Sequence, residues 1–146
     1  MNLTSIVHVN VNCRDFDRSL AFYQMLGFEL LTMVPATNTP EVAAAVGMPP
    51  YRVKGGLVKL KGESVLIDLL EWQEPHSDDP PYENLYHLGL ARIALRTADL
   101  DADMAELKAA GVAFLSEPAT VEWEGQRPTR FVCFRDPDGT VLELVE

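Results

Sequence analysis

The sequence is short of the features that would place the protein in a membrane or an oxidising compartment. It has no run of about 18 apolar residues, so we expect no segment that spans a bilayer. The N-terminus has no basic residues ahead of its apolar ones, unlike a secretory signal. Only two cysteines occur, Cys13 and Cys133, which is too few for a disulfide framework or a zinc pattern. We therefore expect a cytoplasmic protein with two reduced thiols.

Positive charge is also scarce. The chain has 12 Lys and Arg against 22 Asp and Glu, a net charge of −10, and its basic residues do not cluster. Because neutralising phosphates requires a basic patch, we expect no nucleic-acid partner. The rest of the composition, with 47% hydrophobic residues in a chain of 146, is typical of one globular domain.

The most informative feature is an internal repeat. Residues 8–20 align with residues 92–104 at a constant offset of 84. The equivalent pairs are Asp15 with Asp99, Phe16 with Leu100, Asp17 with Asp101, Leu20 with Met104, and Gly27 with Gly111. Each copy predicts a strand, an Asp N-cap, a helix of about eleven residues and a glycine after the helix. The apolar helix faces are Phe16, Leu20, Tyr23 and Leu26 in one copy, and Leu100, Met104, Leu107 and Ala110 in the other.

The two copies also end alike, but at a different spacing. Residues 66–71 align with residues 141–146 at an offset of 75, so the first copy contains nine extra residues. We place them within residues 32–52, where Thr39, Pro40 and Gly47 predict the start and end of a short helix. This insertion is a candidate lid over a binding cavity.

Further strands are expected at residues 29–34, 54–60, 112–116, 120–123 and 131–134. The sequence therefore predicts one α+β domain over residues 1–146, with module one at 1–72, a linker at 73–88 and module two at 89–146. We expect two tandem βαβββ modules forming a curved mixed sheet around a cavity, with the helices on its outer face.

Strand alternation predicts which polar side chains line that cavity. Val7, Val9 and Val11 should face the helix, as should Ile93 and Leu95. The opposite face then carries His8, Asn10 and Asn12 from one copy, and Arg92, Ala94 and Arg96 from the other. Asp68 and Glu143, in the closing strands, share this face. If the sheets curl around one chamber, His8, Asp68, Arg92 and Glu143 converge in it.

Two longer patterns carry a family resemblance. One is His8-Val-x-Val followed by Asp15-x-x-x-Ser19-x-x-Phe22-Tyr23-x-x-Leu26-Gly27-Phe28. The other is Phe131-x-x-Phe134-x-Asp136-Pro137-Asp138-Gly139-x-x-Leu142-Glu143-Leu144. Both resemble the vicinal oxygen chelate superfamily, which includes glyoxalases, bleomycin-resistance proteins and dioxygenases. The resemblance implies a small-molecule ligand or substrate and a homodimer, but no single activity.

The resemblance also implies where a metal would bind. In metal-dependent members the ligands correspond to His8, Asp68, Arg92 and Glu143 of this chain. Arginine breaks that set, because a guanidinium only donates hydrogen bonds and repels a cation. We therefore expect no metal cofactor. The alternative is one divalent ion (Zn, Mn, Fe or Ni) held by His8, Asp68 and Glu143.

Three functions remain open. The first is a glyoxalase-fold enzyme of lyase or isomerase type that acts on a small oxygenated or carboxylated metabolite by acid–base chemistry. Its candidate catalytic residues are Glu143, Asp68 and His8, and its candidate substrate-binding residues are Arg92, Arg96, Asn10 and Asn12. The second is a metal-free binding protein of the bleomycin-resistance type. The third is a metal-dependent lyase or dioxygenase with an incomplete ligand set. The alternative to the first function is that Arg92, Glu143 and Asp68 form only a structural salt-bridge network that neutralises buried charge.

Overall fold

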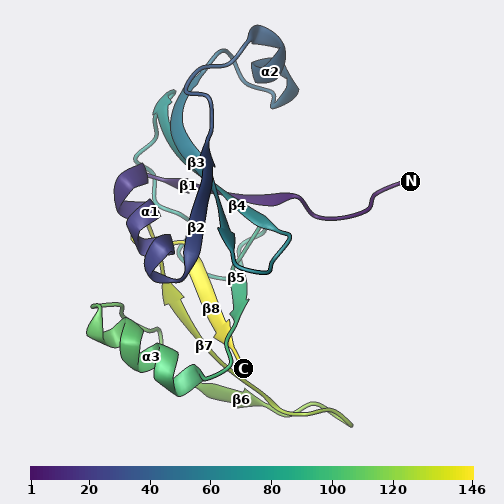
Figure 1. The fold of residues 1–146 in the computed structure, drawn as a ribbon, viewed down its shortest axis with the longest axis vertical. Coiled ribbons are helices and arrows are strands. Elements are labelled where there is room, and N and C mark those ends of the chain that lie inside the picture. The colour runs from purple at the N-terminus through teal and green to yellow at the C-terminus, as the bar shows by residue number, and fades with distance from the viewer. The chain divides into compact units, whose positions relative to one another are not determined.

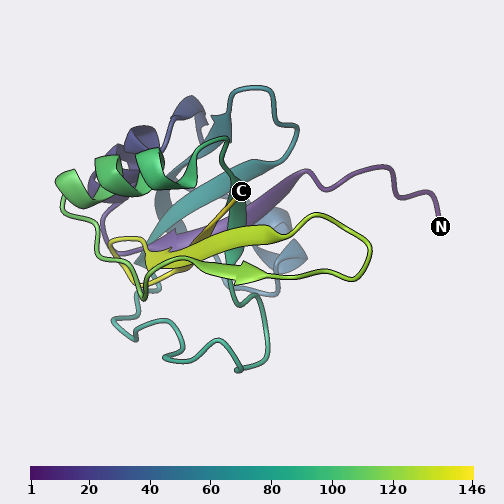
Figure 2. The same cartoon turned by 90° about the horizontal axis from the view of Figure 1, so that it is seen from below.

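The computed structural model describes all residues from Met1 to Glu146, and the chain divides into two compact units, Met1–Asp79 and Pro80–Glu146. Each unit contains one copy of the repeat (Figures 1 and 2). No helix in either unit combines the length and the apolar character that crossing a bilayer requires.

The first unit holds a four-stranded mixed sheet. Its elements are β1 (His8–Cys13), α1 (Phe16–Met25), β2 (Phe28–Met33), α2 (Pro40–Ala45), β3 (Arg52–Leu60) and β4 (Leu66–Glu74). The strand order is β1-β4-β3-β2, with β1 parallel to β4 and the other pairs antiparallel.

The second unit repeats this topology. Its elements are β5 (Ile93–Arg96), α3 (Leu100–Ala109), β6 (Ala119–Val121), β7 (Thr129–Arg135) and β8 (Val141–Val145). The order β5-β8-β7-β6, with β5 parallel to β8, matches the first sheet strand for strand. The predicted α+β class and the two tandem βαβββ modules are thus confirmed.

The ends of the two long helices follow from the repeated residues. The side chains of Asp15 and Asp99 each accept a hydrogen bond from a first-turn N–H, at 2.9 Å, as N-caps do. Gly27 and Gly111 then adopt φ values of +90° and +88°, which a side chain would disfavour.

A second contact fixes where each helix begins. The carboxylate of Glu71 in β4 accepts the backbone N–H of Phe16 at 2.9 Å. Its repeat equivalent, Glu146, accepts the backbone N–H of Leu100 at 3.2 Å. Each contact satisfies a donor that the helix itself leaves without a partner, so the closing strand of each unit positions its helix.

The core of each unit lies between its helix and one face of its sheet. In the first unit the largest buried side chains include Phe16 and Tyr23 of α1 and Leu69 of β4, and α1 contacts β4. Gly56 of β3 allows this approach, because a Cβ there would lie 2.6 Å from Leu30 Cδ1 and 3.3 Å from Phe16 Cζ. In the second unit the corresponding buried side chains are Leu100, Met104, Leu107, Val132, Phe134, Leu142 and Leu144.

Several sequence-based expectations are wrong in detail. No strand forms at 112–116, where Phe114 makes only an isolated bridge to Phe134. Pro118 has no N–H to donate and interrupts that edge before β6 begins. Val7 does not face the helix, because β1 starts one residue later and leaves Val7 64% exposed. Ala110 is the exposed C-cap of α3 and not part of its buried face.

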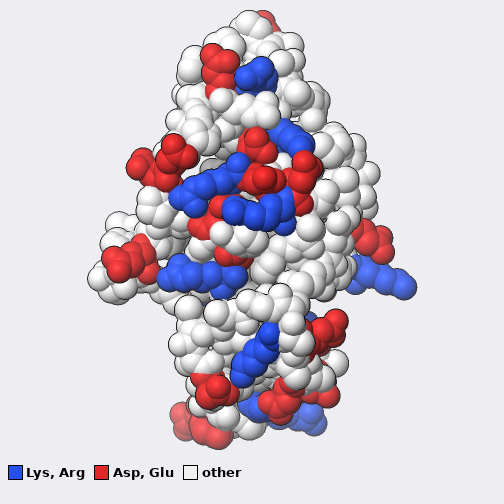
Figure 3. Space-filling model, turned by 90° about the vertical axis from the view of Figure 1, so that its left-hand side faces the viewer, with Lys and Arg blue, Asp and Glu red and all other residues white.

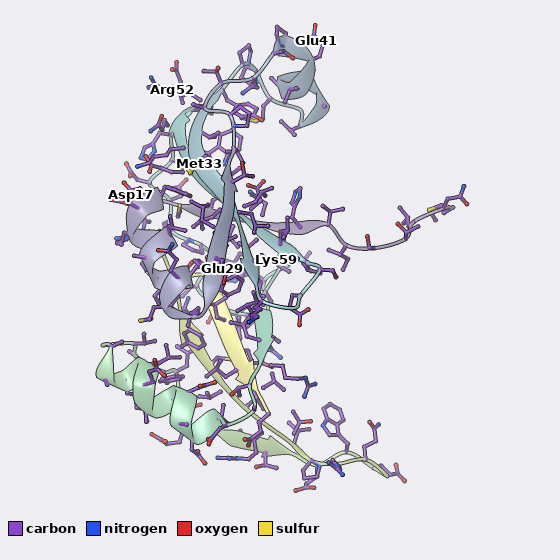
Figure 4. The ribbon with its side chains drawn as sticks, viewed as in Figure 1. Asp17, Glu29, Met33, Glu41, Arg52 and Lys59 are labelled. Atoms are coloured by element: carbon purple, nitrogen blue, oxygen red, sulfur yellow. The ribbon has the colours of Figure 1, made fainter.

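The insertion in the first copy does contain the predicted short helix. Thr39 caps α2, Pro40 occupies its first position, and Gly47 follows it with a φ of +70°. In Figure 4, Glu41 marks α2 and Arg52 marks the start of β3.

Basic side chains on the helix side of each unit have acidic partners. Lys54 Nζ lies 2.6 Å from Asp17 Oδ2, and Arg130 Nη2 lies 2.8 Å from Asp101 Oδ1. Figure 3 accordingly shows blue and red side chains interspersed on the face that it displays. This pattern agrees with the scarcity of basic clusters in the sequence.

Candidate functional site

The candidate residues of the first unit lie on the sheet face opposite α1, called here the non-helix face. His8, Asn10 and Asn12 alternate with the apolar side chains of β1, and Asp68 stands beside Asn10 in the parallel register of β1 and β4. We call His8, Asn10, Asn12 and Asp68 the first cluster.

Asp68 is the most perturbed member of the first cluster. Its Oδ1 is buried and accepts no hydrogen bond, while the side-chain amide of Asn10 donates to its backbone oxygen at 3.0 Å. Burial raises the pKa of Asp68 above its usual value, and the nearby His8 and Asn10 oppose that shift only in part. Asp68 is therefore a carboxyl group that holds a proton more readily than an exposed aspartate does.

Asn12 makes a contact within the protein that the sequence did not predict, and its part in substrate binding stays a prediction. Its Oδ1 accepts a hydrogen bond from the indole N–H of Trp72 at 2.9 Å, so its carbonyl end is engaged within the protein. This pair was not predictable from the sequence, because Asn12 and Trp72 are 60 residues apart.

The second unit places a charged pair at the equivalent positions. Arg92, immediately before β5, brings its Nε to 2.5 Å from Glu143 Oε2 on β8. Glu143 is only 8% exposed, whereas the Arg92 side chain is 44% exposed. The guanidinium thus neutralises a buried carboxylate and remains accessible to a ligand.

Cys133 is a neighbour of this pair that the sequence analysis missed. It lies directly opposite Glu143 in the β7–β8 register, with its Sγ 3.6 Å from Glu143 Oε2. Burial raises the pKa of the Cys133 thiol, and Glu143 adds to this effect while Arg92 opposes it. The sequence signal for this contact is the turn at residues 136–139. If Phe134 pairs with Leu142 across that turn, the next pair along the hairpin is Cys133 with Glu143.

Arg96 is a second basic side chain near Arg92. It ends β5 and is exposed, four residues after Arg92 and hence on the same face. We call Arg92, Arg96, Cys133 and Glu143 the second cluster.

The two clusters are repeat equivalents with different chemistry. Each closing strand carries an acid at the equivalent repeat position, Asp68 in β4 and Glu143 in β8. The residue that accompanies the acid is a histidine in the first cluster and an arginine in the second. The meeting of the clusters in one chamber stays a prediction from the sequence.

Comparison with known proteins settles the family. The family model described as Glyoxalase/Bleomycin resistance protein/Dioxygenase superfamily matches residues 5–144. The chain belongs to this superfamily. Its predicted family is thereby confirmed, and the two βαβββ units are the glyoxalase fold.

Individual relatives agree with this assignment. The uncharacterized protein YwkD of Bacillus subtilis (strain 168) is 29% identical over 150 residues, covering 100% of this chain and 99% of its own. TnmS3, an antibiotic binding protein from Streptomyces sp. CB03234, is 27% identical, with a TM-score of 0.68 over 99% of this chain and 96% of its own. A glyoxalase family protein from Bacillus cereus has a TM-score of 0.83 over 100% of this chain and 95% of its own. At 19% identity, that last likeness shows the fold alone.

Proposed function

We propose that the protein is a glyoxalase-fold enzyme that acts on a small oxygenated or carboxylated metabolite by acid–base chemistry, of the lyase or isomerase type, without a metal ion. The observation that carries the proposal is the Arg92–Glu143 ion pair at 2.5 Å. It puts a fixed positive charge where metal-dependent members of the superfamily are expected to offer a ligand.

The residues do not fit the metal site of those members. Arg92 offers only N–H donors, and a cation would have to displace it from Glu143. Within either unit, no three His, Cys, Asp or Glu side chains form a group able to hold a metal ion. Metal analysis of protein purified without a tag tests this point, and one tightly bound ion per chain would contradict it.

Each cluster supplies a different part of the proposed chemistry. Arg92 and Arg96 bind a substrate carboxylate or stabilise a developing enolate with their fixed positive charges. Glu143 is held by Arg92, so we assign proton transfer to Asp68, whose raised pKa suits a general acid or base. His8, beside Asp68, shares or orients that proton.

Proton abstraction next to a carbonyl can be measured without knowing the substrate. We would incubate the protein in D₂O with pyruvate and with 2-oxobutyrate and follow loss of the C3 proton signals by NMR. Asp68→Asn should slow the exchange by about 100-fold or more, since a positioned acid or base contributes about that much. Undiminished exchange in Asp68→Asn would remove Asp68 from the role of base. Exchange no faster than the buffer rate with the wild-type protein would contradict the proposed chemistry for 2-oxo acids.

A binding protein of the bleomycin-resistance type is the second candidate. The similarity to TnmS3, an antibiotic binding protein, favours it. The net charge of −10 favours a cationic ligand, whereas Arg92 and Arg96 favour an anionic one. Calorimetric titration with bleomycin, a cationic glycopeptide, and with pyruvate separates the two. Tight binding of bleomycin without exchange of any 2-oxo acid would support this second candidate.

We further propose that the protein is a homodimer. Light scattering in solution should then give a mass of about twice the 16.2 kDa of one chain.

A further inference from the structure

An aromatic pair lies on the non-helix face of the first unit, at the end of β4 beyond the first cluster. The ring centroids of Tyr51 and Trp72 are 4.8 Å apart, with 46° between the ring planes. Trp72 is four residues after Asp68 on the same strand and hence on the same face, about 13 Å further along. Both side chains are half-buried.

Hydrogen bonds hold the indole ring of Trp72 and the backbone of both residues in place. The indole N–H of Trp72 donates to Asn12 Oδ1 at 2.9 Å, which satisfies the one polar group of that side chain. The side-chain amide of Asn38 donates to the backbone oxygen of Tyr51 at 2.8 Å. His76 Nδ1 lies 3.0 Å from the backbone oxygen of Trp72. An indole fixed in this way loses little freedom when a ligand binds, which favours binding.

Packing of the βαβββ unit does not require this pair. Tyr51 belongs to the segment 32–52, in which the first copy is longer than the second. The repeat equivalent of Asn12, which anchors Trp72, is Arg96. The second unit builds the same sheet without these anchors. The pair is therefore specific to the first unit, where Asn12 of the first cluster anchors it.

We propose that Tyr51 and Trp72 form a subsite for a planar conjugated ring, so that the ligand is a carbonyl or carboxylate compound that bears an aromatic or heteroaromatic ring. The exposed surfaces of the two rings supply the stacking or edge contact that such a ring prefers. The polar first cluster on the same face receives the oxygenated end. The subsite can bind a substrate or a ligand that undergoes no reaction. This proposal therefore does not depend on the reaction proposed above.

The test compares two probes that differ only in their π system. 2-Naphthoate carries a planar aromatic ring, and decalin-2-carboxylate carries the saturated ring with the same charge. We would titrate each into the full-length ¹⁵N-labelled protein and follow the two indole N–H signals by NMR. The chain has two tryptophans, and Trp123→Phe assigns the signal of Trp72. Trp123, whose indole N–H donates to Thr129 Oγ1 at 2.8 Å, serves as the internal control.

We expect 2-naphthoate to shift the Trp72 signal in a saturable way, to leave the Trp123 signal in place, and to bind about 3- to 10-fold more tightly than decalin-2-carboxylate. Trp72→Phe, which keeps a ring, should retain most of this preference, and Trp72→Leu should abolish it. Because neither variant has the Trp72 indole, their affinities are taken from the backbone amide signals of the same labelled protein. Circular dichroism establishes that each variant is folded.

Three results would overturn the subsite: equal affinity for the two probes, an unchanged preference in folded Trp72→Leu, or no binding of 2-naphthoate at millimolar concentration. Pyruvate has no ring, so its exchange in D₂O tests the proposed chemistry separately. Either proposal can therefore fail while the other stands.

Discussion

We predict that removing Arg92 and removing Glu143 from their ion pair change the stability of the protein by different amounts. Arg92→Met removes the charge that neutralises a carboxylate only 8% exposed, while its unbranched side chain still fills the space of the arginine stem. Glu143→Gln leaves a guanidinium on a side chain that is 44% exposed and can be hydrated. Removing the arginine should therefore cost more free energy of unfolding than removing the acid.

The expected changes in the free energy of unfolding follow from the exposed fractions of the two side chains. Breaking a fully buried pair costs about 3–5 kcal/mol, and an exposed pair contributes about 0–1 kcal/mol. Because the arginine end is partly hydrated, we expect about 1–3 kcal/mol for Arg92→Met and less than about 1 kcal/mol for Glu143→Gln. The double variant should recover part of the loss, since it no longer leaves an unpaired buried charge.

Urea unfolding followed by circular dichroism measures all four members of this double-mutant cycle. Glu143→Gln being as destabilising as Arg92→Met would refute the argument. Strict additivity in the double variant would also refute it, because it would mean that the two charges do not interact.

Three further predictions concern single positions. Arg92→His should allow the protein to bind about one Ni²⁺ or Zn²⁺ ion per chain, as measured by calorimetry, and Arg92→Met should bind none. The raised pKa of Cys133 should make it slower to react with iodoacetamide at pH 8 than a free thiol, as mass spectrometry of timed digests would reveal; alkylation at the free-thiol rate would contradict its burial. Glu71→Ala should lower the free energy of unfolding by about 1–2 kcal/mol, because it leaves the backbone N–H of Phe16 without its acceptor. Glu71→Gln, which keeps an acceptor oxygen, should cost less, and equal losses in urea unfolding would contradict the capping role.

The helices were the most predictable part of the molecule. Their caps depend on short-range chemistry, an Asp at the start and a glycine in the left-handed region after the end. The prediction of a strand at residues 112–116 was wrong, because a short apolar run in the sequence does not indicate whether a neighbouring strand edge is available to pair with it. Alternation predicted that Asp68 lies on the sheet face opposite the helix, but the burial of its Oδ1 depends on tertiary packing.

By itself the sequence determined the duplicated βαβββ architecture, the helix boundaries and the strand faces that carry His8, Asp68, Arg92 and Glu143. All of these depend on local periodicity and capping, which act over a few residues. Tertiary structure alone decided which groups meet across strands: the Arg92–Glu143 ion pair, the Cys133 contact, and the Tyr51–Trp72 rings anchored by Asn12. Such contacts join residues far apart in the chain, and only the register and twist of the folded sheets set their distances.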